Sequence, residues 1–352
     1  MALELRIMTV RRPLSAIVLA ALLLAALALA LPAAAQSPTS PQSSDSIFTR
    51  SLHFTPKGFT HWYAKEQGGP ELITGLPYSS LGCGDCHVGS CDTCHRKDVD
   101  GKAVYTRDAA HLQAACAKCH AVPTGEKAKA DVHASRGMTC MNCHSTREIH
   151  GNGVAYATYA EPGAVEAKCE NCHDAAKCKA FTVHNAKVDC TACHAAAAQQ
   201  CHNCHLETKV KTKKSISVPL ENALFLVNHE GRVTAGTFLS YTYGPKTMIT
   251  FGRSFSHSVV KKGRACAECH GTKNVRDLAA NTFRLMEWDN GQIKNAQGVI
   301  PVVSGTRWNA VFLDRREDKW VPLEKAAEPL IQYSAYVTPL SKEQLARMLA
   351  QR

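Results

Sequence analysis

Residues 83–95, CGDCHVGSCDTCH, contain two copies of a five-residue pattern, Cys-x-x-Cys-His, separated by three residues. The pattern recurs six more times, and 16 of the 17 cysteines fall within its eight copies. Such regular pairing rules out an ordinary cytosolic enzyme and argues against a disulfide scaffold. Numbered in chain order, motifs 1 to 8 occupy residues 83–87, 91–95, 116–120, 140–144, 169–173, 190–194, 201–205 and 266–270.

Cys-x-x-Cys-His is the attachment signature of c-type haem. Two thiols three positions apart reach the two vinyl groups of one porphyrin, and the adjacent histidine becomes the proximal ligand of the iron. Zinc is the alternative, because paired Cys-x-x-Cys motifs also build structural zinc sites. A Cys₄ zinc site has no need of a histidine after every second cysteine, however. We therefore expect eight covalently bound haem c groups, each with its iron.

The residues expected to hold these groups follow directly from the motifs. The cysteines expected to carry haem are Cys83, Cys86, Cys91, Cys94, Cys116, Cys119, Cys140, Cys143, Cys169, Cys172, Cys190, Cys193, Cys201, Cys204, Cys266 and Cys269. The proximal iron ligands are expected to be His87, His95, His120, His144, His173, His194, His205 and His270. Eight haems leave about 40 residues of mature chain for each, so the porphyrins are expected to form much of the core.

The distal ligands are expected among the nine histidines outside the proximal positions, since their number nearly equals the number of irons. Two strong imidazole ligands leave no iron position for a substrate, whereas an open iron allows catalysis. His202 and His229 are the weakest candidates; if neither is a ligand, seven remain and one iron lacks a distal histidine. The seven expected distal ligands are His53, His61, His111, His133, His150, His184 and His257.

Cys178 is the one cysteine outside the motifs, and it lies between Lys177 and Lys179. An inert thiol is one interpretation of this residue. The alternatives are a haem ligand or a thiol that engages a sulfur compound.

The N-terminus has the features of a secretory signal peptide. Arg6, Arg11 and Arg12 are followed by an apolar run over residues 14–31, and residues 33–35 form an Ala-x-Ala cleavage site. We expect residues 1–35 to be removed and the protein to be periplasmic, with an extracellular location as the alternative. An uncleaved anchor is the other interpretation, because 18 apolar residues nearly span a bilayer. After cleavage the chain is not expected to be an integral membrane protein.

The excess of basic residues is explained without an anionic macromolecule. The formal charge of +11 falls to +9 when residues 1–35, with three arginines and Glu4, are removed. Haem propionates add negative charge, so lysine and arginine serve as their counterions. We therefore expect no nucleic-acid partner.

The remaining chain divides into three segments by composition. Residues 36–45 are rich in serine and proline and predict a flexible tether. Residues 46–206 hold motifs 1 to 7 and predict short helices and irregular loops. Residues 207–352 predict a β-rich region with motif 8 and a last helix that begins at a capping box, Ser341 to Gln344. Strands are expected at residues 215–218, 223–227, 233–238 and 248–251, with a further hairpin over residues 283–293.

The dense motifs, the export signal and the motif pair within residues 190–206 resemble octahaem c-type cytochromes of the multihaem superfamily. Octahaem tetrathionate reductase and hydroxylamine oxidoreductase are members, alongside non-catalytic electron carriers. The resemblance covers roughly residues 50–300. It implies a mainly α and irregular fold with a haem-dominated core, to which this chain adds a C-terminal segment containing β-hairpins.

The catalytic members differ from this chain at their active haem. Tetrathionate reductase has a lysine in place of one distal histidine, and Lys179 is the positional candidate here. Hydroxylamine oxidoreductase uses a tyrosine crosslinked to its active haem, and no tyrosine here matches that role. This chain is also shorter than these enzymes.

The sequence therefore predicts an electron-transfer protein of an exported respiratory chain. Its expected partners are other cytochromes or a membrane quinol-oxidising module, together with a terminal reductase. The first alternative is a reductase or oxidase of small sulfur or nitrogen compounds, such as tetrathionate, nitrite or hydroxylamine, at one special haem. The second is a subunit of an extracellular cytochrome filament.

Overall fold

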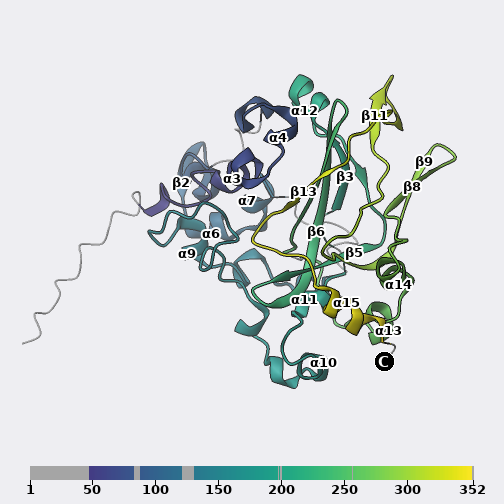
Figure 1. Cartoon of the computed structure of the whole chain (residues 1–352). Helices are drawn as coiled ribbons and strands as arrows, with labels where there is room; N and C mark the ends of the chain where they lie inside the picture. The colour runs from purple at the N-terminus through teal and green to yellow at the C-terminus, as the bar shows by residue number, and fades with distance from the viewer. Residues whose placement is uncertain are drawn as a thin grey trace, which may run out of the picture. The chain divides into compact units, whose positions relative to one another are not determined.

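The computed structural model describes residues 47–82, 88–120, 131–196, 198, 200–255 and 257–350 (Figure 1). The expected signal peptide and tether lie outside the described residues, as do Cys83, Cys86 and His87 of motif 1. Within the described part of the chain, no helix is long and apolar enough to cross a membrane.

Short helices and turns make up most of the segment that holds motifs 2 to 6. Each helix spans only one or two turns, and glycine or an extended residue ends most of them. Between residues 47 and 196 the α-helices are α3 (Lys57–Tyr63), α4 (Glu71–Thr74), α5 (Asp92–His95), α6 (Arg107–His111), α7 (Gln113–Ala117), α9 (Thr146–His150), α10 (Lys179–Val183) and α11 (Cys190–His194). The 3₁₀ turns are η1 (Lys65–Gln67), η2 (Tyr78–Leu81), η4 (Ala134–Arg136), η5 (Cys140–Asn142), η6 (Cys169–Asn171) and η7 (Ala175–Lys177).

A curled, mixed sheet of seven strands organises the second half of the chain. Its longest strand, β6, pairs with β5 and then β3 along one edge and with β7 along the other. Pairing is parallel between β3 and β6, β10 and β5, and β13 and β7. The sheet strands are β3 (Gln200–His205), β4 (Val218–Pro219), β5 (Ala223–His229), β6 (Arg232–Tyr243), β7 (Lys246–Arg253), β10 (Gly298–Pro301) and β13 (Leu330–Tyr333).

Three separate hairpins and four helices complete the described chain. Four tight turns, including the one between β5 and β6, consist of two residues with positive φ, as in Glu230 (48°) with Gly231 (75°). Such turns match the right-handed twist of the strands that they join. The hairpins are β1 (Arg96–Val99) with β2 (Lys102–Tyr105), β8 (Met286–Asp289) with β9 (Gln292–Asn295), and β11 (Leu313–Arg316) with β12 (Lys319–Pro322). The helices are α12 (Leu206–Thr212), α13 (Cys266–Cys269), α14 (Lys273–Ala279) and α15 (Lys342–Leu349).

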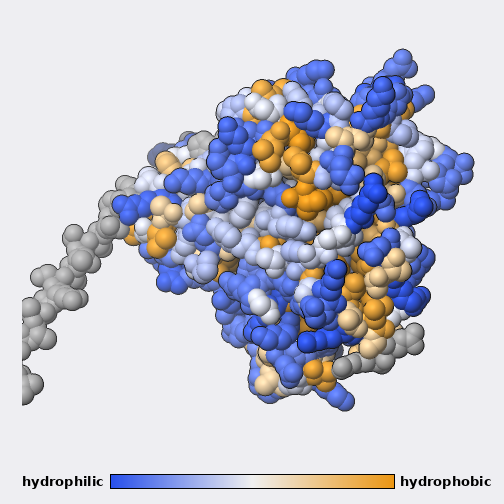
Figure 2. All heavy atoms as spheres, viewed as in Figure 1, coloured by the Kyte–Doolittle hydropathy of each residue, from blue (hydrophilic) through white to orange (hydrophobic). Residues whose placement is uncertain are grey.

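The main apolar core lies on the sheet. Phe225, Phe238 and Phe251 come from β5, β6 and β7, and each is fully buried. The Phe225 and Phe238 rings stack at 4.9 Å, and Trp308 lies 4.8 Å from Phe251. Burial of each aromatic side chain stabilises the fold by about 1.5–3 kcal/mol. Hydrophilic residues cover most of the face viewed in Figure 2, with apolar residues gathered in separate patches.

The expected mainly α and irregular fold with a haem-dominated core is wrong. The chain is 30% helical and 26% strand, and a seven-stranded sheet carries a conventional apolar core. Strand β3 comes from motif 7, in the segment for which short helices and loops were expected. The strands at residues 223–227, 233–238 and 248–251 were predicted by their local pattern. Their assembly with β10 and β13 depends on parallel pairing over long connections, which leaves no local pattern.

Candidate haem-binding sites

Six of the seven described motifs adopt one helical turn. Residues 190–194 form α11, and in the other five the histidine N–H donates to the carbonyl oxygen of the first cysteine. Those five distances lie between 2.8 and 3.0 Å, at His95, His120, His144, His173 and His270. The turn brings both thiols and the imidazole of a motif to one side of the backbone, as attachment to a single porphyrin requires.

The imidazole rings of the described residues meet in five pairs. The centroid distances range from 5.8 Å to 6.2 Å. Every pair joins one motif histidine to one histidine outside the motifs. The pairs are His95 with His150, His120 with His53, His144 with His257, His173 with His133, and His270 with His184.

This spacing is the one that an iron between two imidazoles requires. Two ring nitrogens bound at about 2.0 Å on opposite sides of a metal ion place the ring centroids about 6 Å apart. Rings in direct van der Waals stacking would lie closer together. Five motifs therefore fit a haem with two axial histidines, and the candidate second ligands are His53, His133, His150, His184 and His257.

The pairing does not follow the order of residues along the chain. His133 precedes motif 4 but meets His173 of motif 5. His257 precedes motif 8 but meets His144 of motif 4, at a separation of more than 100 residues. Because tertiary folding sets each pair, the sequence could supply candidate ligands but not their partners.

The second ring nitrogen of several ligands is held by the protein. Nδ1 of His95 donates to the Thr106 carbonyl oxygen at 3.2 Å, and Nδ1 of His184 donates to that of Ala180 at 2.6 Å. Nδ1 of His270 donates to the Arg347 carbonyl oxygen at 3.2 Å. Such bonds fix the tautomer and leave Nε2 for the metal.

Burial favours the neutral form of three ligands. It lowers the pKa of His53, His150 and His257, and neighbouring histidines add to the shift. A neutral imidazole is the form that binds iron. The pKa directions and the ring spacing therefore agree.

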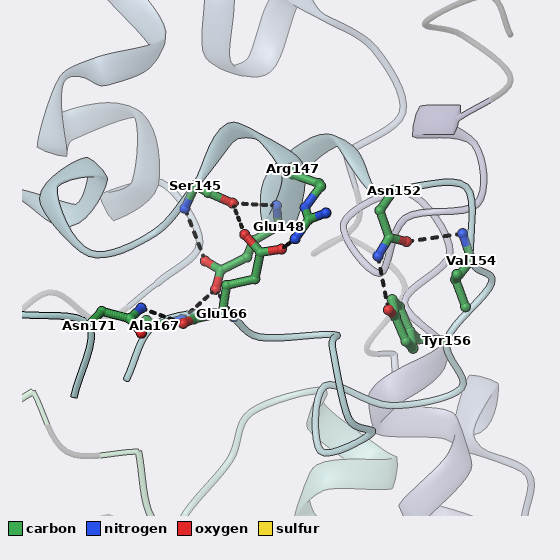
Figure 3. A network of polar contacts seen from close by, with 9 residues as sticks. All are labelled: Ser145, Arg147, Glu148, Asn152, Val154, Tyr156, Glu166, Ala167 and Asn171. Atoms are coloured by element: carbon green, nitrogen blue, oxygen red, sulfur yellow. Dashed lines mark hydrogen bonds and ion pairs between the residues drawn. The ribbon is translucent and has the colours of Figure 1, made fainter. Parts of the chain in front are cut away.

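Glu148 holds His144 of motif 4 through a buried carboxylate. Oε2 accepts from His144 Nδ1 at 2.7 Å and from the Ser145 N–H at 3.2 Å. Oε1 accepts from the backbone N–H groups of Glu166 and Ala167. The side chain of Glu148 is only 5% exposed. Figure 3 shows how Glu148 and Glu166 join α9 to the loop before motif 5.

Neighbouring motifs meet through their cysteines. The Cys116 side chain hydrogen-bonds to that of Cys140, and burial with this neighbour raises the pKa of Cys116 to about 11. Cys169 hydrogen-bonds to Cys190 in the same way, which lowers the pKa of Cys169 and raises that of Cys190. These contacts join motif 3 to motif 4 and motif 5 to motif 6.

At the alternate junctions, the second cysteines of neighbouring motifs lie close enough for one to raise the pKa of the other. Burial raises the pKa of Cys94, and the nearby Cys119 thiol raises it further. Cys172 has the same effect beside Cys143, and Cys193 has it beside Cys269. Motifs 2 and 3, 4 and 5, and 6 and 8 are therefore near neighbours. The motifs therefore follow one another in space in the order 2, 3, 4, 5, 6 and 8.

Motif 6 has the turn but no second imidazole. His194 Nδ1 donates to the Val260 carbonyl oxygen at 2.9 Å. A Cβ atom on Gly263 would lie 3.2 Å from both Nε2 and Cε1 of His194, so the absence of a side chain keeps this edge of the ring open. No histidine ring of the described residues stacks on His194. The site fits a haem with one protein ligand on the described chain.

Unlike the other six described motifs, motif 7 lacks the helical turn that would present its side chains to one haem. Its residues form β3, and the His205 N–H donates to the Ile216 carbonyl oxygen instead of to Cys201. The ring nearest to His205 belongs to Trp320, at 6.3 Å.

The other candidate histidines make no ring contact with a motif histidine of the described residues. Nε2 of His61 is buried without a hydrogen-bond partner, so this nitrogen is able to bind a metal ion. The neighbouring ring belongs to Trp62. His111 ends α6 and is exposed. His229 is 7% exposed, and burial lowers its pKa. Cys178 is exposed, near the Cys193 thiol.

Sequence reasoning missed three residues that lie beside motif histidines, namely Glu148, Gly263 and Asp314, whose Oδ1 accepts from His205 Nε2 at 3.3 Å. Glu148 could have been found, because Ser145 to Glu148 forms a capping box directly after motif 4. Gly263 and Asp314 left no local pattern. Comparison with protein-family models, curated proteins and solved structures gave no match for this chain.

Proposed function

We propose that this protein is an exported multihaem c-type cytochrome that carries electrons in a respiratory chain. The observation that carries the proposal is the set of five imidazole pairs, each joining a motif histidine to a second histidine. Haem supplies an iron that takes up and releases one electron. The residues would hold it at a fixed position, and a second imidazole would exclude water and substrates from the iron.

The order of the motifs supports transport over distance. Cysteines of successive motifs lie near one another from motif 2 to motif 6, and Cys193 of motif 6 lies near Cys269 of motif 8. Groups attached at such cysteines are near neighbours. Electron tunnelling falls steeply with distance, so a row of close sites suits transfer from one end to the other. Its partners are other cytochromes or a quinol-oxidising membrane module, with a terminal reductase as acceptor.

The test is a redox titration of the exported protein followed by optical and EPR spectroscopy. We expect low-spin ferric signals from most irons, full reduction by a soluble donor and rapid reoxidation by a second cytochrome. A protein that holds zinc, or no haem, would overturn the proposal.

Motif 6 favours a second candidate function, the reduction or oxidation of small sulfur or nitrogen compounds. Its His194 has no second imidazole among the described residues, so this iron is the candidate for an open position. Under this alternative, nitrite, sulfite or hydroxylamine would change a high-spin EPR signal and be turned over. Unchanged spectra with all three compounds would contradict this alternative and leave the electron-carrier proposal standing. The alternative of a filament subunit, which the sequence also raised, predicts that filaments are visible by negative-stain microscopy.

A further inference from the structure

Motif 7 differs from the other described motifs in its backbone. Cys201 pairs with Leu239 of β6 and Cys204 with Tyr241, so three steps along β3 match two steps along β6. The extra residue forms a bulge, with Asn203 at φ 58°. A strand conformation replaces the helical turn.

This conformation sends the thiols and the imidazole to opposite faces of the sheet. Adjacent residues of a strand point to opposite faces. Cys204 lies beside Tyr241 and packs on the apolar cluster of Ile73, Leu206 and Met248. His205, which pairs with Thr242, lies on the other face. One porphyrin cannot be bonded to Cys204 and lie over His205 at the same time.

Both ring nitrogens of His205 are hydrogen-bonded to other residues of the chain. Nε2 donates to Asp314 Oδ1 at 3.3 Å, and Nδ1 accepts from the Thr208 N–H at 3.3 Å. This is the reverse of His95 and His270, where Nδ1 donates. The nitrogen that would bind iron is therefore the protonated one.

The two residues between the cysteines of motif 7 join the sheet to the start of β11 and the residues just before it. His202 Nε2 donates to the Val311 carbonyl oxygen at 2.7 Å, and its Nδ1 accepts from Ser240 Oγ at 2.8 Å. Asn203 Nδ2 donates to the Leu313 carbonyl oxygen and Oδ1 accepts from the Leu313 N–H, both at 2.7 Å. His202 and Asn203 are fully buried. His202 and Asn203 thus hold β3 against Val311 and Leu313 without any bound group.

From this geometry we infer that motif 7 is a structural latch and carries no haem, so that Cys201 and Cys204 remain unmodified in the native protein. The inference rests on the proposed function, since it lowers the haem count from eight to seven. The latch joins β3 to residues 311–314, and the cysteines fill the opposite face of the strand.

The test is the intact mass of the exported full-length protein under denaturing conditions, with a peptide map. Thioethers survive denaturation, so the count does not depend on folding. We expect seven haems for each chain, with Cys201 and Cys204 open to alkylation after unfolding. The double variant C201S/C204S should keep the same haem count. The matched double variant C140S/C143S should lose one haem.

The outcomes separate the inference from the proposed function. Eight haems, or a haem-bearing peptide with Cys201 and Cys204, would overturn the latch and leave the cytochrome proposal standing. A loss of one haem in C201S/C204S would do the same. A chain without any haem would overturn the proposed function itself.

Discussion

His95 and His150 face one another with ring planes 16° apart and centroids 5.8 Å apart. The two residues come from α5 and the end of α9, and Nδ1 of His95 donates to the Thr106 carbonyl oxygen. A metal ion fits between rings with this centroid spacing, and the hydrogen bond at Nδ1 of His95 leaves its Nε2 to bind the metal. Ring centroids at a similar distance recur at four other motifs, which is why the imidazole pairs carry the functional proposal.

Removal of one second ligand should affect one iron. In His184→Ala, the partner of His270 is lost, and we expect one low-spin ferric EPR signal to be replaced by a high-spin signal. Thr182→Ala on the same helix, α10, is the matched control and should leave the spectrum unchanged. A wild-type spectrum in His184→Ala would show that His184 is not a ligand.

Glu148→Gln should raise the reduction potential of the motif 4 iron. The carboxylate at 2.7 Å from His144 Nδ1 increases the electron donation of that imidazole, and the amide does so less. A tenfold effect on the one-electron equilibrium corresponds to about 59 mV. Glu161→Gln is the control, since Glu161 accepts from the Ala157 and Thr158 N–H groups. Equal potentials in both variants, measured by spectroelectrochemistry, would count against this role.

Gly263→Ala should perturb the site at motif 6. The new Cβ would lie 3.2 Å from His194 Nε2, where the ring must bind iron. We expect an altered spectrum for one iron, with the other irons unchanged. Gly58→Ala is the control, because its Cβ would make ordinary contacts with Tyr159 at 3.7 Å and Thr158 at 4.0 Å. Identical spectra for the two variants would contradict this assignment.

Asn203 should contribute to stability through its two bonds to Leu313. Asn203→Gly removes both bonds but tolerates the positive φ, and we expect it to lower the free energy of unfolding by about 1–3 kcal/mol. Asn203→Ala adds backbone strain of about 1–2 kcal/mol. Urea unfolding of both variants measures the difference. Equal stabilities of Asn203→Gly and wild type would remove the energetic support for the latch.

His202 should make stability depend on pH in one direction. Burial lowers its pKa to about 4 from an ordinary value of 6.5, so the folded protein holds the neutral form. The unfolded chain binds a proton below pH 6.5, and stability from this residue is therefore lost as pH falls toward 4. His202→Gln should reduce the slope of unfolding free energy against pH in this range. An unchanged slope would contradict the burial argument.

The sequence marks the candidate sites by local spacing, and it predicts the architecture less well. The motifs and the candidate second ligands are visible in the sequence because covalent attachment would demand a fixed local spacing. The pattern that predicted the strands at residues 223–227 and 233–238 was also local, because Glu230 and Gly231 form the turn between β5 and β6. The partner of each histidine and the strand conformation of motif 7 depend on contacts between distant segments, such as His257 with His144 and Asn203 with Leu313. No local pattern encodes those contacts.

The most direct test of the account is quantitative low-temperature EPR of the fully oxidised, exported protein. Five imidazole pairs predict at least five low-spin ferric irons for each chain, with signals typical of two axial histidines. A sample without ferric haem, or one in which most of the iron is high-spin, would contradict the central claim.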